Sequence, residues 1–192
     1  MNRDKVIGFL LLLTTVSLFC EDTKRIRIVE VEGNVGKRWA ICIGIDDYED
    51  NSILDLKKAG NDAKTMGAVL IDNGQFDYVL VMTDDLSPRD ENYPKVRNIT
   101  GRLDFIKEFI SPEDMIVFFF SGHGVSNEQG DGYLVAADTA DEELFATSVS
   151  LNEVITTLAD AGITKSLLII DACREYFREN KGVNDEAHFH DL

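Results

Sequence analysis

The chain has 192 residues, with 19 Lys and Arg against 35 Asp and Glu, so its formal net charge is −16. Apolar residues make up 44% of it, which is ordinary for a packed domain and too high for a disordered chain. The length suits one domain, and three cysteines are too few for a disulfide scaffold. The acidity argues against nucleic acid as a partner, because phosphates require clustered Lys and Arg.

The first twenty residues have the pattern of an export signal. Arg3 and Lys5 precede a largely apolar stretch over 6–19, which is shorter than the ~20 residues of a membrane-spanning helix. Cys20 stands where a bacterial lipoprotein carries its lipidated cysteine. We therefore expect export to the periplasm or outer surface, with a lipid anchor at Cys20 as the route to a membrane. A buried N-terminal helix is the alternative.

The remainder divides into three segments by composition. We expect an N-terminal strand and linker over 21–36, a folded domain over 37–180 and a polar tail over 181–192. The turn over 33–36, followed by Lys37, superficially resembles a phosphate-binding loop. Its spacing is wrong, and Arg38 occupies the place of the required Ser or Thr, so a nucleotide site is excluded.

Hydrophobic patterning predicts five strands and three helices in this domain. The strands are short apolar runs, expected over 39–45, 78–82, 115–120, 133–137 and 166–170. The first helix carries apolar residues at helical spacing from Ala59 to Leu70 and ends near 73–74, and the second carries them from Val96 to Ile110. The third begins at a capping box over 150–153, has Leu151, Val154, Ile155 and Leu158 on one side, and ends at Gly162.

Alternating strands and helices predict an α/β fold with a mostly parallel central sheet and helices on both faces. The run over 115–120 is wholly apolar, as a central strand buried on both faces should be. In such sheets, ligands bind beyond the carboxyl ends of the strands. Reactive side chains that directly follow a strand are therefore the first candidates for a site.

Two scarce reactive residues follow predicted strands. Cys42 lies inside the first strand between isoleucines and reads as a small buried hydrophobe. By contrast, His123 and Cys173 each come two or three residues after an apolar strand. If these strands are neighbours, ~4.8 Å apart, both residues lie at the same crevice. An unrelated thiol beside a strand-end turn is the alternative.

A cysteine beside a histidine is suited to nucleophilic catalysis. A free thiol, with a pKa of ~8.5, is only slightly ionised at neutral pH, and an adjacent imidazole removes its proton or stabilises the thiolate. The resulting nucleophile attacks carbonyl carbon. Gly124 allows close backbone approach, so its amide and that of Cys173 are candidates to bind a developing oxyanion.

The motifs around these residues resemble those of the caspase-like cysteine peptidases, close to metacaspases and their bacterial relatives. The residues are Ser-Gly-His-Gly over 121–124 and Asp-Ala-Cys-Arg over 171–174, with the histidine 50 residues before the cysteine, as in the caspase signature. Further agreement lies in 39–48, 59–63 and 132–135. The resemblance implies a three-layer caspase-like fold and a cysteine-type endopeptidase that cleaves peptides through a dyad of Cys173 and His123.

The resemblance also implies a substrate preference. Asp62 and Asp171 match positions that in metacaspases form an acidic pocket for an Arg or Lys side chain before the scissile bond. Charge-assisted hydrogen bonds of this kind contribute ~1.5–3 kcal/mol, so the pocket is expected to favour cleavage after basic residues. A structural role, with either aspartate capping a backbone or paired with Arg174, is the alternative.

No cofactor is expected, with calcium as the alternative. Many metacaspases require calcium, and the loop after His123 offers oxygen ligands at Glu128, Asp131, Asp138, Asp141, Glu142 and Glu143. The spacing is not that of a calcium loop and is also typical of a solvated acidic loop. In the tail, His188 and His190 lie near Asp185 and Glu186, but a polar tail needs no metal to explain them. No metal site is assigned.

The family's catalytic domain normally continues with a smaller segment that adds strands, whereas 19 residues follow Cys173 here. We expect this segment to be absent from the chain. A partner chain could supply the strands; alternatively, the protein is a truncated or inactive caspase-like module that acts in protein–protein interaction. Another cysteine-based acyl transferase is a third hypothesis, whereas a serine hydrolase is disfavoured because no Gly-x-Ser-x-Gly motif occurs.

Overall fold

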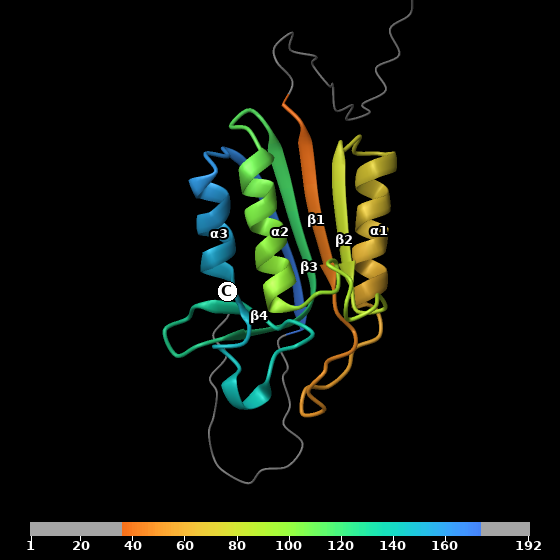
Figure 1. The fold of residues 1–192 in the computed structure, drawn as a ribbon, viewed down its shortest axis with the longest axis vertical. Coiled ribbons are helices and arrows are strands. Elements are labelled where there is room, and N and C mark those ends of the chain that lie inside the picture. Colours follow the sequence, from red (N-terminus) through yellow and green to blue (C-terminus); the bar gives the residue numbers. More distant parts are fainter. Residues whose placement is uncertain (1–35, 174–192) are drawn as a thin grey trace, which may run out of the picture. The chain divides into compact units, whose positions relative to one another are not determined.

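A largely parallel β-sheet forms the centre of the protein, of which the computed structural model describes residues 36–173 (Figure 1). The strands are β1 Arg38–Gly44, β2 Tyr78–Thr83, β3 Met115–Ser126, β4 Gly132–Leu134, β5 Val149–Ser150 and β6 Lys165–Cys173. The α-helices are α1 Ala59–Asp72, α2 Val96–Phe109 and α3 Leu151–Asp160, and Asp141–Glu143 form a 3₁₀ turn.

Four strands make up the parallel part of the sheet, in the order β2, β1, β3, β6. Strand β3 is central, because β1 pairs with one of its edges and β6 with the other. The last residues of β3 also pair with β4 in the antiparallel sense, and β5 continues from β4. The predicted α/β class with a mostly parallel sheet is confirmed.

The two faces of the sheet bury two separate apolar clusters, because successive side chains of a strand point to opposite faces. On one face, Ile41 and Phe118 belong to the larger cluster, which includes Leu103 of α2 and Leu158 of α3. On the other face, Cys42 and Phe119 belong to a smaller cluster with residues of α1. Helices thus cover both faces, so β1 and β3 are apolar along their whole central length.

Strand β3 extends further than the sequence predicts. The apolar run ends at Phe120, but the strand continues through the Ser-Gly-His-Gly motif to Ser126. Two partners keep this polar extension in the sheet: β6 accompanies it to His123, and β4 pairs with 124–126. The backbone groups of the extension therefore stay hydrogen-bonded, and His123 lies within a strand instead of a loop.

Two smaller expectations are corrected in part. The strand predicted over 133–137 is the shorter β4: the Val135 amide still bonds to the His123 carbonyl of β3, but the Ala137 amide bonds to the Pro94 carbonyl outside the sheet. The predicted capping box does start α3, where the Ser150 hydroxyl accepts the Glu153 amide at 3.4 Å. Ile155, predicted on the apolar side of this helix, is 47% exposed, since that side is narrower than the sequence suggests.

The expectations for export, for the lipidated Cys20 and for the N-terminal strand within 21–36 fall on residues before 36, which lie outside the described residues. Within 36–173, no helix is both long enough and apolar enough to cross a membrane.

A buried carboxylate, Asp114, joins the amino-terminal ends of β1 and β3. It accepts hydrogen bonds from the backbone amides of Lys37 at 2.6 Å and Ser111 at 3.0 Å, and from the Trp39 indole at 3.0 Å. Burial by itself raises the pKa of Asp114, but these three donors outweigh it, so the pKa lies below its usual value. The charged form therefore stabilises the folded state.

Replacing Asp114 is expected to destabilise the protein in a pH-dependent way. The variant Asp114→Asn should lower the free energy of unfolding by about 1–3 kcal/mol at pH 7, since buried donors lose a charged acceptor. Because the folded-state pKa is lowered, this contribution is complete above the unfolded-state pKa of ~3.9 and is lost as the pH falls through the folded-state pKa. Urea unfolding at several pH values measures it.

The exposed Asp104 on α2 offers a control with the same loss of charge. Asp104→Asn should stay within about 0.5 kcal/mol of wild type. An equal effect of the two substitutions would contradict the role given to Asp114.

Candidate active site

The predicted catalytic residues lie on neighbouring strands at the carboxyl edge of the sheet. The parallel register of β3 and β6 pairs His123 with Cys173 and, two residues earlier, Ser121 with Asp171. The prediction that the two strands are neighbours is confirmed. Adjacent strands are ~4.8 Å apart, so the register brings together two residues that are 50 positions apart in the sequence.

The two strands approach closely beside this pair. A Cβ atom added to Gly124 would lie 2.8 Å from the Cβ of Ala172, which is closer than two carbon atoms can pack. Gly124 is therefore required by the packing of β3 against β6, apart from any role of its amide. The candidate oxyanion donor thus follows His123 directly on β3, one residue beyond the last pair of the β3–β6 ladder.

The His123 side chain is buried and held by a backbone carbonyl. It is 2% exposed, and its Nε2 lies 2.7 Å from the carbonyl oxygen of Leu54. A carbonyl only accepts hydrogen bonds, so Nε2 must carry the proton. In the neutral imidazole, the basic nitrogen is then Nδ1, and the Leu54 carbonyl fixes this tautomer.

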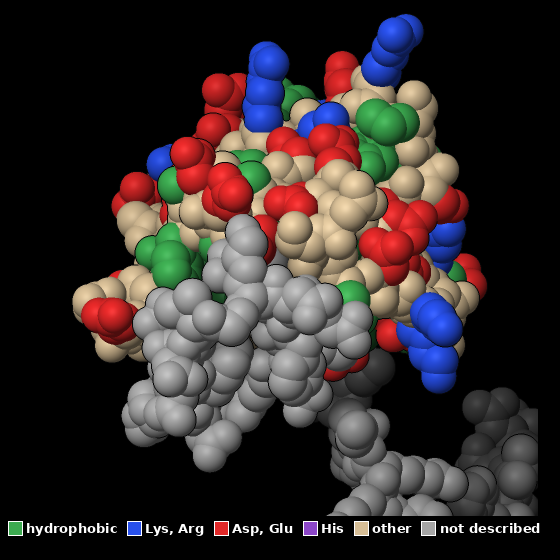
Figure 2. Space-filling model, turned by 90° about the horizontal axis from the view of Figure 1, so that it is seen from below, with side chains coloured by type: hydrophobic (Ala, Val, Ile, Leu, Met, Phe, Trp, Pro, Cys, Tyr) green, Lys and Arg blue, Asp and Glu red, His purple; other side chains and the backbone are tan. Residues whose placement is uncertain are grey.

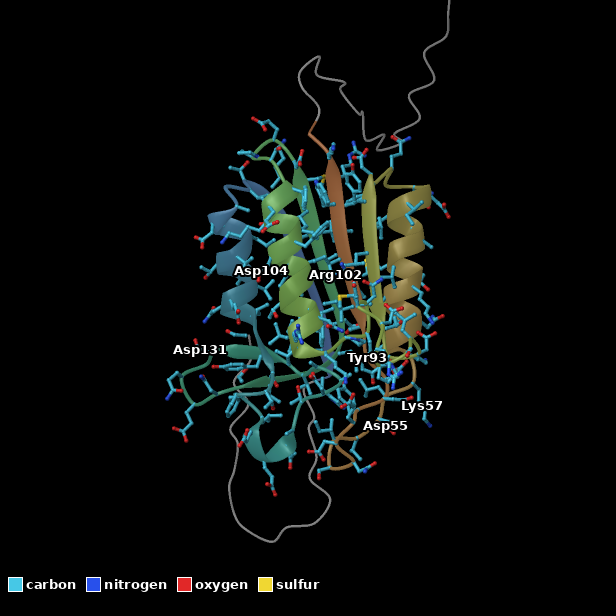
Figure 3. All side chains as sticks on the ribbon, viewed as in Figure 1. Asp55, Lys57, Tyr93, Arg102, Asp104 and Asp131 are labelled. Carbon is cyan, nitrogen blue, oxygen red and sulfur yellow. The ribbon has the colours of Figure 1, made fainter. Side chains whose placement is uncertain are left out.

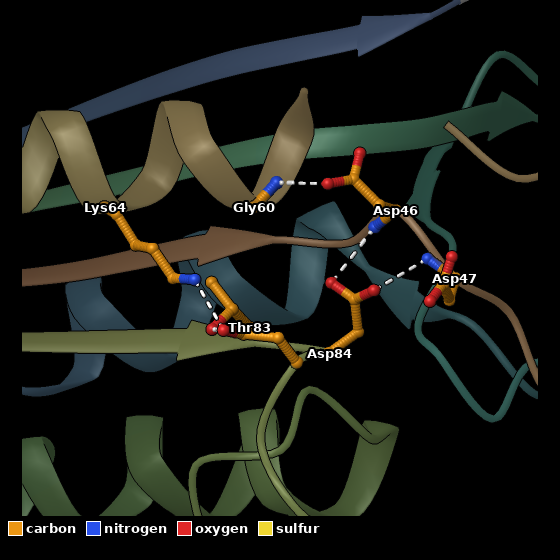
Figure 4. A network of polar contacts seen from close by, with 7 residues as sticks. Asp46, Asp47, Gly60, Lys64, Thr83 and Asp84 are labelled. Carbon is orange, nitrogen blue, oxygen red and sulfur yellow. Dashed lines mark hydrogen bonds and ion pairs between the residues drawn. The ribbon is translucent and has the colours of Figure 1, made fainter. Parts of the chain in front are cut away.

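Leu54 belongs to the β1–α1 loop, residues 45–58, and two carboxylates brace this loop (Figure 4). The Asp46 carboxylate accepts hydrogen bonds from the amides of Ala59 at 2.8 Å and Gly60 at 3.1 Å. These amides open α1, where the helix itself provides no acceptor. The Asp84 carboxylate, directly after β2, accepts the amides of Asp46 at 3.1 Å and Asp47 at 2.8 Å. Both ends of the loop are thus tied to regular elements.

Sequence reasoning did not find Leu54, Asp46 or Asp84. A backbone carbonyl leaves no signal in the residue type, so Leu54 could not be recognised without coordinates. Asp46 has a weak signal, because an aspartate shortly before a helix is a common N-terminal cap. Its distance of 13 residues from Ala59 conceals it, since caps normally adjoin the helix.

The two predicted substrate-binding aspartates lie on the same side of the sheet. Asp62 is half-buried in the first turn of α1, and Asp171 is exposed near the end of β6. Asp171 is two residues after Ile169 on β6, so the two side chains share a face of the sheet, and Ile169 packs in the cluster on the α1 face. Asp171 therefore lies on the α1 side at the carboxyl edge, as Asp62 does.

Comparison with known proteins agrees with this arrangement. Residues 38–174 match the model of the metacaspase, peptidase C14 domain. The chain belongs to the metacaspase family. It is therefore a member of a family of cysteine peptidases, and the sequence resemblance to that family is confirmed.

Individual metacaspases match part of the chain. Metacaspase-3 of Arabidopsis thaliana is 35% identical over 112 residues, which are 57% of this chain and 29% of that protein. Metacaspase-1 of Scheffersomyces stipitis is 28% identical over 99 residues, or 50% of this chain and 24% of that protein. The chain thus spans about a quarter of the length of the curated relatives it matches.

Two solved structures, one of them a caspase, resemble this chain in fold. Pro-sf-caspase-1 aligns with a TM-score of 0.50 at 16% identity, covering 88% of this chain and 61% of that one. The protein GSU0716 from Geobacter sulfurreducens aligns with a TM-score of 0.55 at 17% identity, covering 71% of this chain and 50% of that one. At this identity, the likeness concerns the fold alone.

The carboxyl edge of this metacaspase-family domain is acidic. Seen from that end, Asp and Glu side chains crowd the visible surface, and Lys and Arg side chains stand mostly towards its margin (Figure 2). Asp55 and Lys57 lie there on the β1–α1 loop, away from Asp104 on α2 (Figure 3). Partial desolvation and neighbouring carboxylates, foremost Asp84, raise the pKa of Asp47 on the same loop. Such a surface attracts cationic ligands.

Cys42 does not compete with Cys173 for the role of nucleophile. It is 0% exposed inside β1, and burial raises the pKa of its thiol to about 11. A thiol of this kind is protonated and inaccessible at neutral pH. The prediction that Cys42 is a small buried hydrophobe is confirmed.

The described residues do not offer a cage for calcium. Between 36 and 173, no group of three or more His, Cys, Asp and Glu side chains is arranged to hold a metal ion. Two of the carboxylates considered as ligands bind the protein itself: Asp131 accepts the side-chain amides of Asn127 and Asn152, and Asp138 accepts the Val96 amide at the start of α2. The histidines of the tail, His188 and His190, lie outside the described residues.

Two glycine substitutions should have opposite effects on stability. Gly124→Ala is expected to lower the free energy of unfolding by about 1–3 kcal/mol, because the added methyl group overlaps Ala172. Gly101 occupies an exposed position of α2 with open space around it, so Gly101→Ala should raise the free energy of unfolding by about 0.4–1 kcal/mol through helix propensity. Thermal or urea unfolding measures both changes. A rise in the free energy of unfolding for both variants would contradict the close approach of β3 and β6.

Proposed function

We propose that this chain carries a cysteine-type endopeptidase centre in which Cys173 is the nucleophile and His123 the general base and acid. The register that pairs these residues at the carboxyl edge of the sheet carries the proposal. The hydrogen bond from Nε2 to the Leu54 carbonyl supports it, because this bond directs the basic Nδ1 to proton transfer.

The reaction proceeds in two stages. His123 takes the proton of the Cys173 thiol, and the thiolate attacks the peptide carbonyl carbon to form a tetrahedral intermediate. The amides of Gly124 and Cys173 donate to the oxyanion as it develops. The imidazolium then protonates the leaving amine, the C–N bond breaks, and a thioester remains. Water, deprotonated by His123, hydrolyses the thioester and restores the thiol.

The proposed substrate is a peptide or protein with Arg or Lys before the scissile bond. Asp62, in the first turn of α1, and Asp171, two residues before Cys173 on β6, supply carboxylates on the side of the sheet where α1 lies. A guanidinium or ammonium group placed there gains charge-assisted hydrogen bonds, whereas an aspartate side chain is repelled. The acidic carboxyl edge raises the local concentration of cationic segments before they bind.

The catalytic assignment is tested by cleavage of an Arg-containing peptide with the full chain. Cys173→Ala should abolish turnover, because it removes the proposed nucleophile. Cys42→Ala should keep turnover within about threefold of wild type, since it removes a buried thiol that does not ionise. Peptide products separated by mass provide the measurement.

Equal turnover by wild type and Cys173→Ala would contradict the assignment of Cys173 as the nucleophile. A folded wild-type sample that neither cleaves nor reacts at Cys173 with a peptide electrophile would favour a non-catalytic caspase-like module. Transfer of the acyl group to an added amine without hydrolysis would favour an acyl transferase.

If Asp62 and Asp171 bind the basic side chain, their substitution should lower kcat/KM for basic substrates only. Asp62→Asn and Asp171→Asn should each lower kcat/KM for an Arg peptide by about 10–100-fold, which corresponds to the ~1.5–3 kcal/mol of a charge-assisted bond. A peptide with a neutral residue at that position should be cleaved no more slowly than by wild type. Comparative kinetics on the two peptides provides the measurement.

Asp47→Asn is the matched control, because it removes one charge from the same edge at an exposed loop position. It should change kcat/KM for the Arg peptide less than about threefold. If all three substitutions lower kcat/KM equally, the overall negative charge of the carboxyl edge determines the preference for basic peptides, and the assignment of a pocket is wrong.

A further inference from the structure

The pairing of β3 with β1 ends two residues before His123. Strand β1 pairs with β3 only up to the pair of Gly44 and Ser121, and the Ile45 amide then bonds to the Ser121 carbonyl at 3.1 Å. Beyond this point β1 leaves the sheet and becomes the β1–α1 loop. The next donor of β3 on that side, the His123 amide, would have no acceptor from a strand.

A tyrosine hydroxyl from the same loop takes the place of the missing strand. The amide of His123 donates to the Tyr48 hydroxyl oxygen at 3.0 Å, and that hydroxyl lies 3.4 Å from the Ile45 carbonyl, to which it donates. Tyr48 is buried, at 7% exposure. The hydroxyl therefore bridges Ile45, the first residue after β1, and the backbone of the candidate general base.

The surroundings are shaped for this hydroxyl. A Cβ atom added to Gly122 would lie 3.3 Å from the Tyr48 oxygen and 2.9 Å from the Phe120 ring, so only glycine leaves room for both. The Tyr48 ring also packs against the imidazole, with centroids 5.2 Å apart and planes inclined by 36°. One side chain thus contacts both the backbone and the ring of His123.

We propose that Tyr48 is a positioning residue for the imidazole, an inference that rests on the proposed role of His123 as general base. Two residues of one loop hold this histidine: Tyr48 fixes its backbone amide and ring plane, and the Leu54 carbonyl fixes its Nε2 proton. If the backbone moves, the distance from Nε2 to Leu54 lengthens and the tautomer is no longer imposed. Misplacement of a general base by a fraction of an ångström slows proton transfer while substrate binding is kept.

The test compares Tyr48→Phe with Tyr93→Phe in the full chain. The first substitution removes the hydroxyl and keeps the ring. The second is the matched control, a buried tyrosine of the same apolar cluster, at 6% exposure, in the connection between β2 and α2 (Figure 3). Two measurements are made: kinetics on an Arg peptide, and imidazole ¹⁵N chemical shifts of His123, assigned by their loss in His123→Ala.

Tyr48→Phe should lower kcat about tenfold with KM within about twofold of wild type, and should turn the single neutral tautomer of His123 into a mixture. Tyr93→Phe should leave both measurements at their wild-type values. An unchanged tautomer in Tyr48→Phe would overturn the inference, whatever the change in rate, because a merely structural tyrosine lowers stability without altering the ring.

The failure of this inference and that of the proposed function are distinguishable. If the wild type cleaves no peptide, the proposed function fails, and the ¹⁵N shifts alone still decide whether Tyr48 orients His123. If Tyr48→Phe does not fold, Gly122→Ala takes its place, since the added methyl group displaces the hydroxyl while the tyrosine remains. A mixed tautomer in that variant supports the inference, and an unchanged one overturns it.

Discussion

The parallel pairing of β3 with β6 is the constraint on which the rest of the candidate site depends. All nine residues of β6 lie in register with β3, so one slip of the ladder would separate His123 from Cys173. Both faces of β3 are apolar, so polarity alone does not specify this register; a shift by one residue would instead exchange the side chains of the two apolar clusters, which would have to repack. Gly124 contributes by allowing the close approach to Ala172 at the end of the pairing.

The second requirement is a rigid loop beside the sheet edge. The β1–α1 loop supplies Tyr48 and the Leu54 carbonyl to His123, and it is tied down by carboxylates at its two ends. These carboxylates act locally, because each accepts two backbone amides, and collectively, because they add to the negative charge of the carboxyl edge. The same aspartates therefore hold the loop that contacts His123 and make the carboxyl edge attractive to cationic groups.

At the amino-terminal edge of the sheet, a single buried carboxylate joins the strands. There the buried Asp114 carboxylate accepts hydrogen bonds from three donors in the residues around the starts of β1 and β3. The acidic residues of this chain thus fall into two classes. Some stabilise the fold through bonds to its own backbone, and others, such as Asp171, stay exposed at the edge where the catalytic pair lies.

The sequence by itself determined the strands and helices, the α/β class and the two motifs of the family, because these depend on local periodicity and on residues adjacent in the chain. It also determined that Cys42 is buried and that Cys173 and His123 each follow an apolar strand, whereas the pairing of these two strands came from the structure. Only the tertiary structure decided that β3 runs through the motif to Ser126, that Leu54 fixes the tautomer and that Tyr48 holds the His123 backbone. These features arise from contacts between segments 69 or 75 residues apart, and a carbonyl or a common tyrosine carries no sign of its distant partner in its own sequence.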